Sequence, residues 1–568
     1  MMMMDQESSS PLNRHEQDDV DIGDDEDETD AASAPKPVTF DTFEQVLSAV
    51  GSFGAYHWAF IIVMQFSIVM WCGNFVFMPY ATYMPTVECH VNGSVVVHDH
   101  RNATFFCELY SGGHCTNVTW EAPFRTIIEQ WGLLCDLDYV PELINTIQMV
   151  GTLVALFFTG VLSDKFGRKR VFTVCFVVLM VACYLGTLAP DWQTLAASRF
   201  VVGGLISATF VVNFVWSMEM TGQDNNFVMN LAGLWHFGYI STALIGYLTR
   251  DWQLYLLILD AIGLPLLFFY TCFVESPRWL IQKGRLEKAA KQLTRMSQRN
   301  QSACNRVLIT SDSLSAIPQE RDGKRHGLLT LLSSRRLLLY TFLLSLITFA
   351  TASASYAFVF QVSLLSGSPF VKLAMYGAFR IYIPFVLYYA DRKLDWFGRR
   401  EMIYIPMLIV CLCYTMATMS EVLTGSSNMI AMMAGAVCCN CLWTGIGQYQ
   451  MELFPTRLRS TSSSVVLMFD PLASVFMPQL VYAERYYHPA PVMEVALVTF
   501  IALVAAYTML PETKGRPLPD TLDDVAELGY ERAMRPWKRL RRLLCDTGND
   551  TELLANMEAD VEPIDGAM

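Results

Sequence analysis

Long apolar runs constrain this sequence more than any other feature. Segments of about 20 mostly apolar residues recur along the chain, and each is long enough to cross the roughly 30 Å hydrocarbon core of a bilayer as a helix. The 568 residues are 53% hydrophobic and only 17% charged. A soluble protein of this size would show amphipathic periodicity and more charge. We therefore predict a polytopic helical membrane protein.

Twelve segments qualify as spanning helices. They lie near residues 57–80, 139–162, 170–189, 194–217, 227–248, 252–274, 336–361, 373–391, 401–420, 427–450, 461–483 and 491–510. A long polar stretch separates the sixth from the seventh and divides the set into six plus six. The predicted fold class is an all-α membrane protein with 12 transmembrane helices in two pseudo-symmetric six-helix bundles.

The spans and the polar stretches together give five predicted regions. These are an acidic cytoplasmic tail over 1–45, a first bundle over 46–275 that includes a loop over 85–138, a cytoplasmic linker over 276–335, a second bundle over 336–515 and a cytoplasmic tail over 516–568. The first 40 residues hold twelve acids and few large apolar residues, which is typical of disorder. The net charge of −14 is therefore a local feature, and we expect no nucleic-acid partner. The chain starts without a signal peptide, so the first span is expected to act as its own insertion signal.

The basic residues orient the helices. With the N-terminus inside, 33 of the 40 Lys and Arg residues fall on the cytoplasmic side, 5 fall outside and 2 lie within spans. Retention of basic residues in the cytoplasm is the usual topological bias. We expect a multi-pass protein of the plasma membrane with both termini in the cytoplasm.

The loop after the first span supports this orientation. It carries three glycosylation sequons, at Asn92, Asn102 and Asn117, and four of the 15 cysteines, Cys89, Cys107, Cys115 and Cys135. Four cysteines in a loop of this kind predict two disulfides with three possible connectivities. Free thiols and unused sequons are the alternative. Two further sequons, at Asn300 and Asn549, fall on the cytoplasmic side and are expected to stay unmodified.

A short motif occurs twice at the ends of apolar runs. The stretch from Asp164 reads DKFGRK and the stretch from Asp395 reads DWFGRR. Met-Glu219 similarly matches Met-Glu452, and Glu275-Ser matches Glu512-Thr, in the same order in each half. Three matches in register indicate two homologous bundles. The alternative for a single copy is that its basic residues only anchor a helix to lipid headgroups.

The chemistry of this motif suits a movable joint. An acidic residue at a helix end can pair with the following basic residues or with the N-terminus of a neighbouring helix. Glycine permits a tight turn where helices approach closely. We predict a cytoplasmic latch that forms in one state of the protein and breaks in another.

Four motifs carry a resemblance to a known family. They are GVLSDKFGRKR, ESPRWLIQKGRLEKA, YQMELFPTRLR and LPETKGRPLPDT. The chain resembles the major facilitator superfamily over about residues 40–525, and within it the organic cation, carnitine and anion transporter branch. This resemblance implies a transporter. It extends the predicted latch to Asp164, Gly167, Arg168, Glu219, Glu275, Arg278, Asp395, Gly398, Arg399, Glu452, Arg459 and Glu512. Because MTGQDNN follows Glu219 without the basic residue expected there, the latch of the first half is predicted to be weakened.

No sequence pattern indicates catalysis. The chain has no GxxxxGK[ST] phosphate-binding motif, and no zinc or catalytic-triad pattern stands out. We expect no enzyme activity and no cofactor. Transport is then driven by the substrate gradient, a coupled ion or the membrane potential.

Ionisable residues inside spans are costly and usually functional. Asp470, in the eleventh span, is our candidate for cation recognition, because a carboxylate in a low-dielectric cavity attracts an ammonium group strongly. By resemblance, cation-transporting members carry an acidic residue close to this position. The alternatives for Asp470 are an ion pair with Arg380 or a role at the helix break before Pro471.

Arg380, in the eighth span, points to a different substrate. An arginine facing the cavity could bind a carboxylate, or it could neutralise Asp470. Aromatic residues on spans can bind alkylammonium groups through cation–π attraction, although any one of them can equally be a packing residue. The predicted substrate site consists of Asp470, Arg380, Tyr356, Trp216, Tyr239 and Phe370.

The sequence thus predicts a polyspecific carrier that moves small organic cations by alternating access, with the cation and the lipid bilayer as its partners. An organic anion or a carnitine-like zwitterion is the alternative substrate, because of Arg380. An alternative of another class is a non-transporting receptor or scaffold that acts through its loop and its acidic tail.

Overall fold

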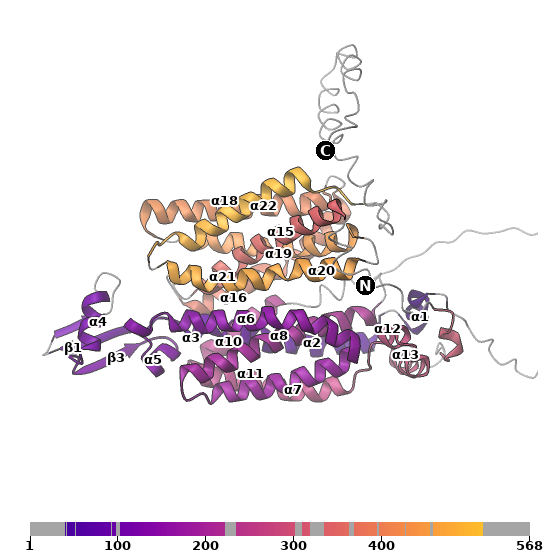
Figure 1. Cartoon of the computed structure of the whole chain (residues 1–568), viewed down its shortest axis with the longest axis horizontal. Helices are drawn as coiled ribbons and strands as arrows, with labels where there is room; N and C mark the ends of the chain where they lie inside the picture. Colours follow the sequence, from indigo (N-terminus) through magenta and orange to yellow (C-terminus); the bar gives the residue numbers. More distant parts are fainter. Residues whose placement is uncertain are drawn as a thin grey trace, which may run out of the picture.

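The computed structural model of the chain shows two helical bundles whose helices run along a common axis (Figure 1). It describes residues 40–514 except 41, 52, 92–93, 98–102, 222–234, 301–308, 318–333, 363–367, 395–396, 427, 455–457 and 485. The predicted tails therefore lie almost wholly outside the described residues, and so does much of the linker.

Each bundle is built from one half of the chain. The first bundle contains α2 (Ala55–Phe75), α6 (Val140–Phe166), α7 (Arg168–Thr187), α8 (Trp192–Met220), α10 (Trp235–Thr249) and α11 (Trp252–Thr271). The second contains α15 (Arg335–Gln361), α16 (Pro369–Ile381), α17 (Ile383–Lys393), α18 (Arg399–Thr424), α19 (Met429–Glu452), α20 (Arg459–Leu467), α21 (Phe469–Ala483) and α22 (Ala490–Met509). The predicted division into two helical bundles is confirmed.

Eleven spans in the described part of the chain are long and apolar enough to cross a membrane. The remaining prediction, over 227–248, corresponds to α10, and the first part of that predicted span lies outside the described residues. Two of the predicted spans are interrupted. The eighth is divided into α16 and α17 at Tyr382, and the eleventh into α20 and α21 at Met468.

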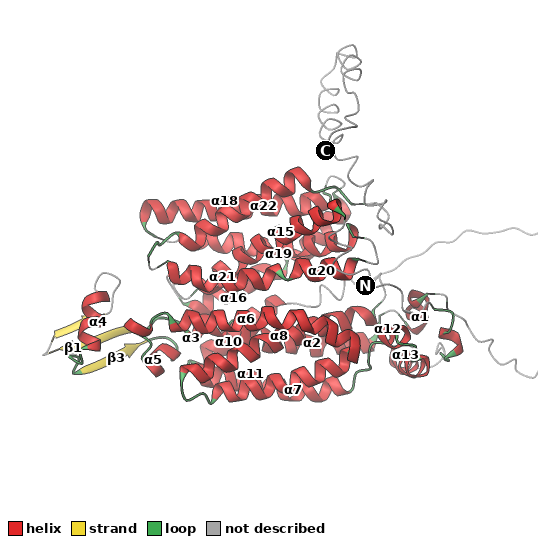
Figure 2. Ribbon diagram, viewed as in Figure 1, coloured by secondary structure: helices red, strands yellow, loops and turns green. Residues whose placement is uncertain are grey.

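The predicted loop after the first span folds as a small unit that we call the insert (residues 84–138). It holds β1 (Thr86–Val91), β2 (Ser94–Val97), β3 (Asn117–Glu121), α4 (Ala103–Ser111), α5 (Ile127–Trp131) and the 3₁₀ turn η1 (Cys135–Leu137). The strands form an antiparallel sheet in the order β2-β1-β3. Figure 2 shows these strands at one end of an otherwise helical molecule. We call this the insert end.

Two disulfide bonds cross-link the insert. Cys89 joins Cys115 and Cys107 joins Cys135, which is one of the three connectivities that the sequence allows. Asn117 begins β3 and is exposed, whereas Asn92 and Asn102 lie outside the described residues.

The opposite end, which we call the linker end, carries short helices. These are α1 (Phe43–Val50), α12 (Pro277–Gln282) and the strongly amphipathic α13 (Leu286–Asn300). Helix α13 buries Ala289, Leu293 and Met296, and its basic side chains cover the other face. Figure 1 places α12 and α13 at the end of the first bundle that lies farthest from the strands.

The two bundles pack against each other through α6 with α21 and α10 with α16. A Cβ atom on Gly377 would lie 2.7 Å from the carbonyl oxygen of His236, so glycine allows α16 to approach α10 closely. Toward the insert end, Gln479 Nε2 donates to Thr146 Oγ1 at 2.7 Å. The Tyr482 hydroxyl also donates to Asp138 Oδ1 at 3.4 Å.

Candidate functional site

Asp470 lies where the eleventh span is interrupted. It occupies the first turn of α21, and the Tyr356 hydroxyl of α15 donates a hydrogen bond to Asp470 Oδ1 at 2.9 Å. Pro471 lacks an N–H and so cannot complete the backbone hydrogen bond that would join α20 smoothly to α21. A carboxylate in the first turn of a helix is stabilised by the positive end of the helix dipole. The break therefore gives Asp470 a favourable place inside the bundle.

Arg380 occupies the complementary position, in the last turn of α16. Cations are favoured at that end of a helix. The buried guanidinium donates to the Tyr376 hydroxyl and, at 3.4 Å, to Asn440 Oδ1. Pro384 cannot donate to the Arg380 carbonyl, four residues earlier, and Asn440 Nδ2 donates to that carbonyl instead at 3.3 Å. Each buried charge thus lies beside a proline-linked interruption of its span.

Asp470 and Arg380 do not pair with each other. Each has a different tyrosine as its partner, and the ion pairs between described residues include neither side chain. The structure therefore does not support the alternative in which Arg380 neutralises Asp470. Two opposite charges remain inside the second bundle with only neutral polar partners.

Both tyrosine partners face the first bundle. The Phe75 ring of α2 lies 5.6 Å from the Tyr356 ring, and the Tyr239 ring of α10 lies 5.0 Å from the Tyr376 ring. The two charges and their tyrosines are therefore at the interface between the bundles, away from the lipid-facing surface. We call this group the central site, and it consists of Phe75, Tyr239, Tyr356, Tyr376, Arg380 and Asp470.

Two predicted site residues lie elsewhere. Trp216 is fully buried in the first bundle, where its indole N–H donates to the Val274 carbonyl at 3.1 Å and its ring packs on Phe60. Phe370 packs against Tyr80 and against Phe124 of the insert, toward the insert end. The structure thus gives Trp216 a packing environment and puts Phe370 where the bundles meet beside the insert.

Other residues of the interior were missed by the sequence analysis. Phe75, Tyr376 and Asn440 carry no charge, so nothing in their sequence context distinguishes them from packing residues. Asp260 did carry a signal, because it interrupts the apolar run of the sixth span. It is buried in the first bundle within electrostatic range of Arg199, which lies 4.3 Å from the Phe77 ring.

The predicted latch of the first half forms one connected network at the linker end. The Arg168 guanidinium contacts Asp164 at 2.9 Å. It also donates hydrogen bonds to both carboxylate oxygens of Glu219, at 2.9 and 2.8 Å. Glu275 Oε1 accepts the Lys169 amide at 2.9 Å. Arg168 is therefore the cation that Glu219 contacts, while most of the MTGQDNN stretch lies outside the described residues, so the weakening expected there stays a prediction.

Gly167 allows the backbone between α6 and α7 to approach Glu275 closely. Its φ of 102° is in a region that side chains other than glycine rarely adopt, and an added Cβ would lie 2.6 Å from Glu275 Oε2. The remaining predicted member of this half, Arg278, lies 5.8 Å from the Phe43 ring and makes no ion pair with a described carboxylate.

The second half repeats this arrangement. Arg399 contacts Glu452 at 2.9 Å, and its amide donates to Glu512 at 2.9 Å. A Cβ on Gly398 would lie 2.3 Å from Glu512 Oε2, as close an approach as at the corresponding glycine of the first half. A second acidic partner of Arg399 is Asp391, at 2.9 Å, a residue that the sequence did not indicate. Asp395 and the side chain of Arg459 lie outside what the structure describes.

Glu512 stays charged in this network. Burial alone would raise the pKa of its carboxyl, but hydrogen bonds from the amides of Lys514, Arg399 and Arg400 outweigh burial and hold the pKa below its usual value. The backbone at the start of α18 therefore has a fixed negative charge as its acceptor.

Comparison with known proteins identifies the family. The model of the Major Facilitator Superfamily matches residues 140–478, more than half of the chain. The chain belongs to the major facilitator superfamily. Members of this superfamily are transporters, so this protein is a transporter rather than an enzyme.

Named relatives of this superfamily member cover most of its length. Solute carrier family 22 member 15 of Xenopus tropicalis is 26% identical over 452 residues, which is 78% of this chain and 83% of the relative. An organic cation transporter-like protein of Drosophila melanogaster is 25% identical over 470 residues, or 78% of each chain. The human organic cation/carnitine transporter 2 is 26% identical over 416 residues, or 70% of this chain and 72% of the relative.

Solved structures agree on the fold. The partially occluded inward-open form of the xylose transporter XylE from E. coli matches with a TM-score of 0.56 at 14% identity, over 82% of this chain and 100% of that one. At this identity the match shows that the superfamily fold is shared.

Proposed function

We propose that this protein carries small organic cations across the plasma membrane by alternating access. The observation that carries the proposal is Asp470, a carboxylate in the first turn of α21 at the bundle interface. It makes no ion pair with a described residue, and a tyrosine hydroxyl is its hydrogen-bond donor. A substrate ammonium group can supply the missing positive charge, and the attraction is strong because the site is shielded from bulk water.

Aromatic rings around Asp470 suit an alkylated cation. Tyr356 stacks on Phe360 at 5.7 Å, and Phe75 lies on the side of the first bundle. Aromatic faces attract alkylammonium groups by about 0.5–2 kcal/mol each, with little demand on the shape of the substrate. A site of this kind supports broad selectivity, and the names of two relatives include organic cations.

Uptake into cells expressing the chain tests this proposal. We expect saturable uptake of labelled tetraethylammonium, inhibited by other quaternary amines and reduced when high external potassium depolarises the cells. A monovalent cation moving inward gains about 2.3 kcal/mol per 100 mV of membrane potential. Absence of saturable uptake for every quaternary amine tested would contradict the cation proposal.

A zwitterion is a second candidate substrate, and Arg380 is the observation that favours it. Its guanidinium has neutral polar partners only, Tyr376 and Asn440, so it could bind the carboxylate of a substrate whose ammonium group reaches Asp470. The name of one relative includes carnitine.

The substitution Arg380→Gln separates the two substrates. For a cation substrate we expect uptake to change by less than about threefold, and any change should be an increase, because the substitution removes a positive charge that repels the cation. For a carnitine-like zwitterion we expect a fall of about 30-fold or more, since a hydrogen bond between two charged groups is worth roughly 1.5–3 kcal/mol and an unpaired carboxylate adds its desolvation cost. Parallel uptake of tetraethylammonium and carnitine by the same cells is the measurement.

The proposed topology predicts glycosylation of the insert. Asn117 is exposed at the start of β3, so its sequon is accessible if the insert is extracellular. Peptide mass spectrometry after glycosidase treatment should find Asn117 modified. It should find Asn300 unmodified, because Asn300 lies at the linker end, where its side chain accepts the Tyr56 amide at 3.0 Å. Modification of Asn300 and not of Asn117 would contradict the proposed topology and indicate the opposite orientation in the membrane.

A further inference from the structure

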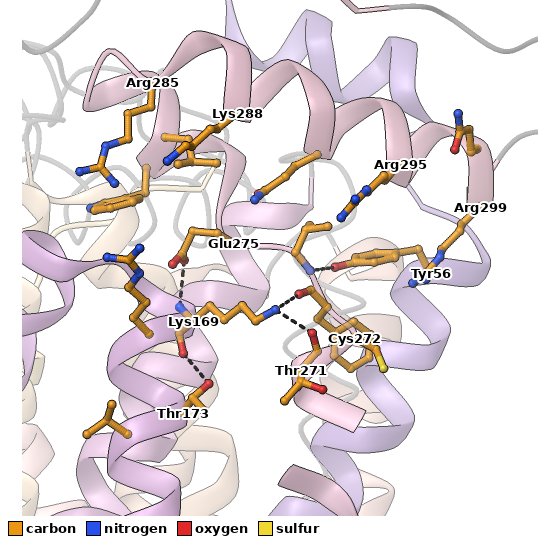
Figure 3. Close-up of a pocket in the computed structure, with 18 residues that line it drawn as sticks. Tyr56, Lys169, Thr173, Thr271, Cys272, Glu275, Arg285, Lys288, Arg295 and Arg299 are labelled. Atoms are coloured by element: carbon orange, nitrogen blue, oxygen red, sulfur yellow. Dashed lines mark hydrogen bonds between the residues drawn. The ribbon is translucent and has the colours of Figure 1, made fainter. Parts of the chain in front are cut away.

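A pocket of about 780 Å³ opens at the linker end of the first bundle. Its walls come from the start of α7, the residues that follow α11, and the helices α12 and α13. None of its lining residues belongs to the central site, so it is a separate feature of the molecule. Figure 3 shows its lining side chains.

The pocket is strongly basic. Its lining includes six cationic side chains, Lys169, Arg170, Arg285, Lys288, Arg295 and Arg299, and one acid, Glu275. The oxygen Oε1 of Glu275 accepts hydrogen bonds from the backbone amides of Lys169 and Ser276, so this oxygen is already engaged by the backbone. The ion pairs found between described residues involve none of the six cations. Among the described residues that line the pocket, one acid therefore stands against six cations, and most of the positive charge remains uncompensated.

The cations differ in how they are held. Lys169 Nζ donates to the carbonyls of Thr271 and Phe273 at 2.8 and 2.6 Å and so supports the end of α11. Arg285 lies over the Trp279 ring at 5.3 Å, and Arg299 over the Tyr56 ring at 5.9 Å. Aromatic contacts of this kind orient the guanidinium groups and leave their N–H groups available to a ligand.

Lys288 and Arg295, like Arg170, make no such aromatic contact in the described part of the chain, and these two are the available cations on α13. They lie seven residues apart on α13, which places them on one face of that helix, two turns apart. Figure 3 shows Arg285, Lys288 and Arg295 along one side of the pocket, with Lys169 and Glu275 across from them. A ligand between these walls would meet positive charge from two directions.

The pocket continues into an apolar surface. Val174 lines it and is 64% exposed, and Cys272 on the opposite wall is also exposed. Val178, farther along α7, and Phe268, in the last turn of α11 before Cys272, are exposed as well. In a membrane protein such an apolar surface faces lipid, so a molecule in the pocket can extend hydrocarbon chains along it.

We propose that this pocket binds a membrane lipid whose headgroup carries several phosphate charges, with its chains along α7 and α11. Basic pockets at the cytoplasmic boundary of spanning helices have the right chemistry for such headgroups, and arginine matches phosphate in bidentate geometry. A soluble polyphosphate shares the headgroup chemistry but makes no use of the apolar surface.

The test is direct binding to the full-length purified protein in phosphatidylcholine nanodiscs. The probe is a fluorescent short-chain phosphatidylinositol bisphosphate, with phosphatidylserine and the soluble inositol trisphosphate as competitors. The pocket variant is Lys288→Gln with Arg295→Gln. Its matched control is Lys283→Gln with Lys291→Gln, which removes the same charge from exposed residues at the same end that do not line the pocket.

We expect saturable binding that weakens about 30-fold in the pocket variant, since each basic side chain near an anionic headgroup contributes about fivefold. The control variant should change by less than about threefold, and inositol trisphosphate should compete at least about tenfold more weakly than the lipid. Equal loss in both variants would overturn the site, because a general basic surface would then explain the binding.

Two other outcomes would also overturn the proposal. Competition by phosphatidylserine as strong as by the bisphosphate would remove the preference for several charges, and equal competition by inositol trisphosphate would assign the pocket to a soluble ligand. The competition arms use the unaltered protein, so they do not depend on how the variants fold. No transport substrate is present, so the result is independent of the proposed function.

Discussion

Replacing Asp470 with Asn should lower the uptake of tetraethylammonium at low concentration by about 100-fold. The substitution keeps the size and polarity of the side chain and removes only the negative charge that would face the substrate. Two opposite charges 4 Å apart attract by about 4 kcal/mol at the effective dielectric constant near a protein surface. We expect somewhat less to be lost, because the asparagine oxygen can still accept from Tyr356.

Two related variants make this prediction specific. Asp470→Glu retains the charge and should keep most of the uptake. Tyr356→Phe removes the hydroxyl that donates to Asp470 at 2.9 Å but keeps the ring, so we expect a loss of only about threefold to fivefold. Each uptake rate is divided by the amount of protein at the cell surface. Unchanged uptake by Asp470→Asn at equal surface amount would remove Asp470 from substrate recognition.

Replacing Arg168 with Gln should be the most destabilising single change at the linker end. The Arg168 side chain is only 7% exposed and contacts two carboxylates, and Glu219 is 13% exposed. Removing one partner of a buried ion pair typically costs about 3–5 kcal/mol, because the other charge is left without compensation. We expect a cost at the lower end of this range, because Asp164 is 63% exposed and can be hydrated. Thermal unfolding of the purified protein is the measurement.

A double variant shows whether the pairing itself is responsible. Arg168→Gln with Glu219→Gln leaves no unpaired charge at Glu219, so it should be more stable than Arg168→Gln alone. Arg125→Gln is the matched control, because its pair with Asp251 is 51% and 25% exposed and such surface pairs contribute at most about 1 kcal/mol. A double variant no more stable than the single one would contradict this account of the latch.

The membrane fold was predictable because its signals are local. Apolar runs of span length reveal helices without knowledge of their neighbours, and the repeated glycine-arginine motif reveals the duplication. The interruptions next to Asp470 and Arg380 were also signalled, since Pro471 and Pro384 follow these charges closely and proline cannot continue the backbone ladder. Ionisable residues in apolar runs stand out because membrane burial makes them rare.

Partnerships between distant residues were less predictable. The register of the repeated motif selected Asp395, which lies outside the described residues, but it gave no indication of Asp391, which also contacts Arg399. Sequence register grouped Arg168 and Glu219 in one latch, but it did not show that Arg168, at the start of another helix, contacts both Glu219 and Asp164. Trp216 fits an aromatic cavity residue by sequence, yet it packs inside the first bundle. In each case the answer depends on which helix faces which, and no local pattern carries that information.

The central claim is that a cation balanced by Asp470 crosses the membrane between two rocking bundles. Its most direct test is uptake of labelled tetraethylammonium by proteoliposomes that contain the purified protein, with the membrane potential set by a potassium gradient and valinomycin. We predict saturable uptake that rises steeply when the interior is made negative and that disappears for Asp470→Asn. Uptake that does not change with the membrane potential, or that persists in the Asp470→Asn protein, would contradict the claim.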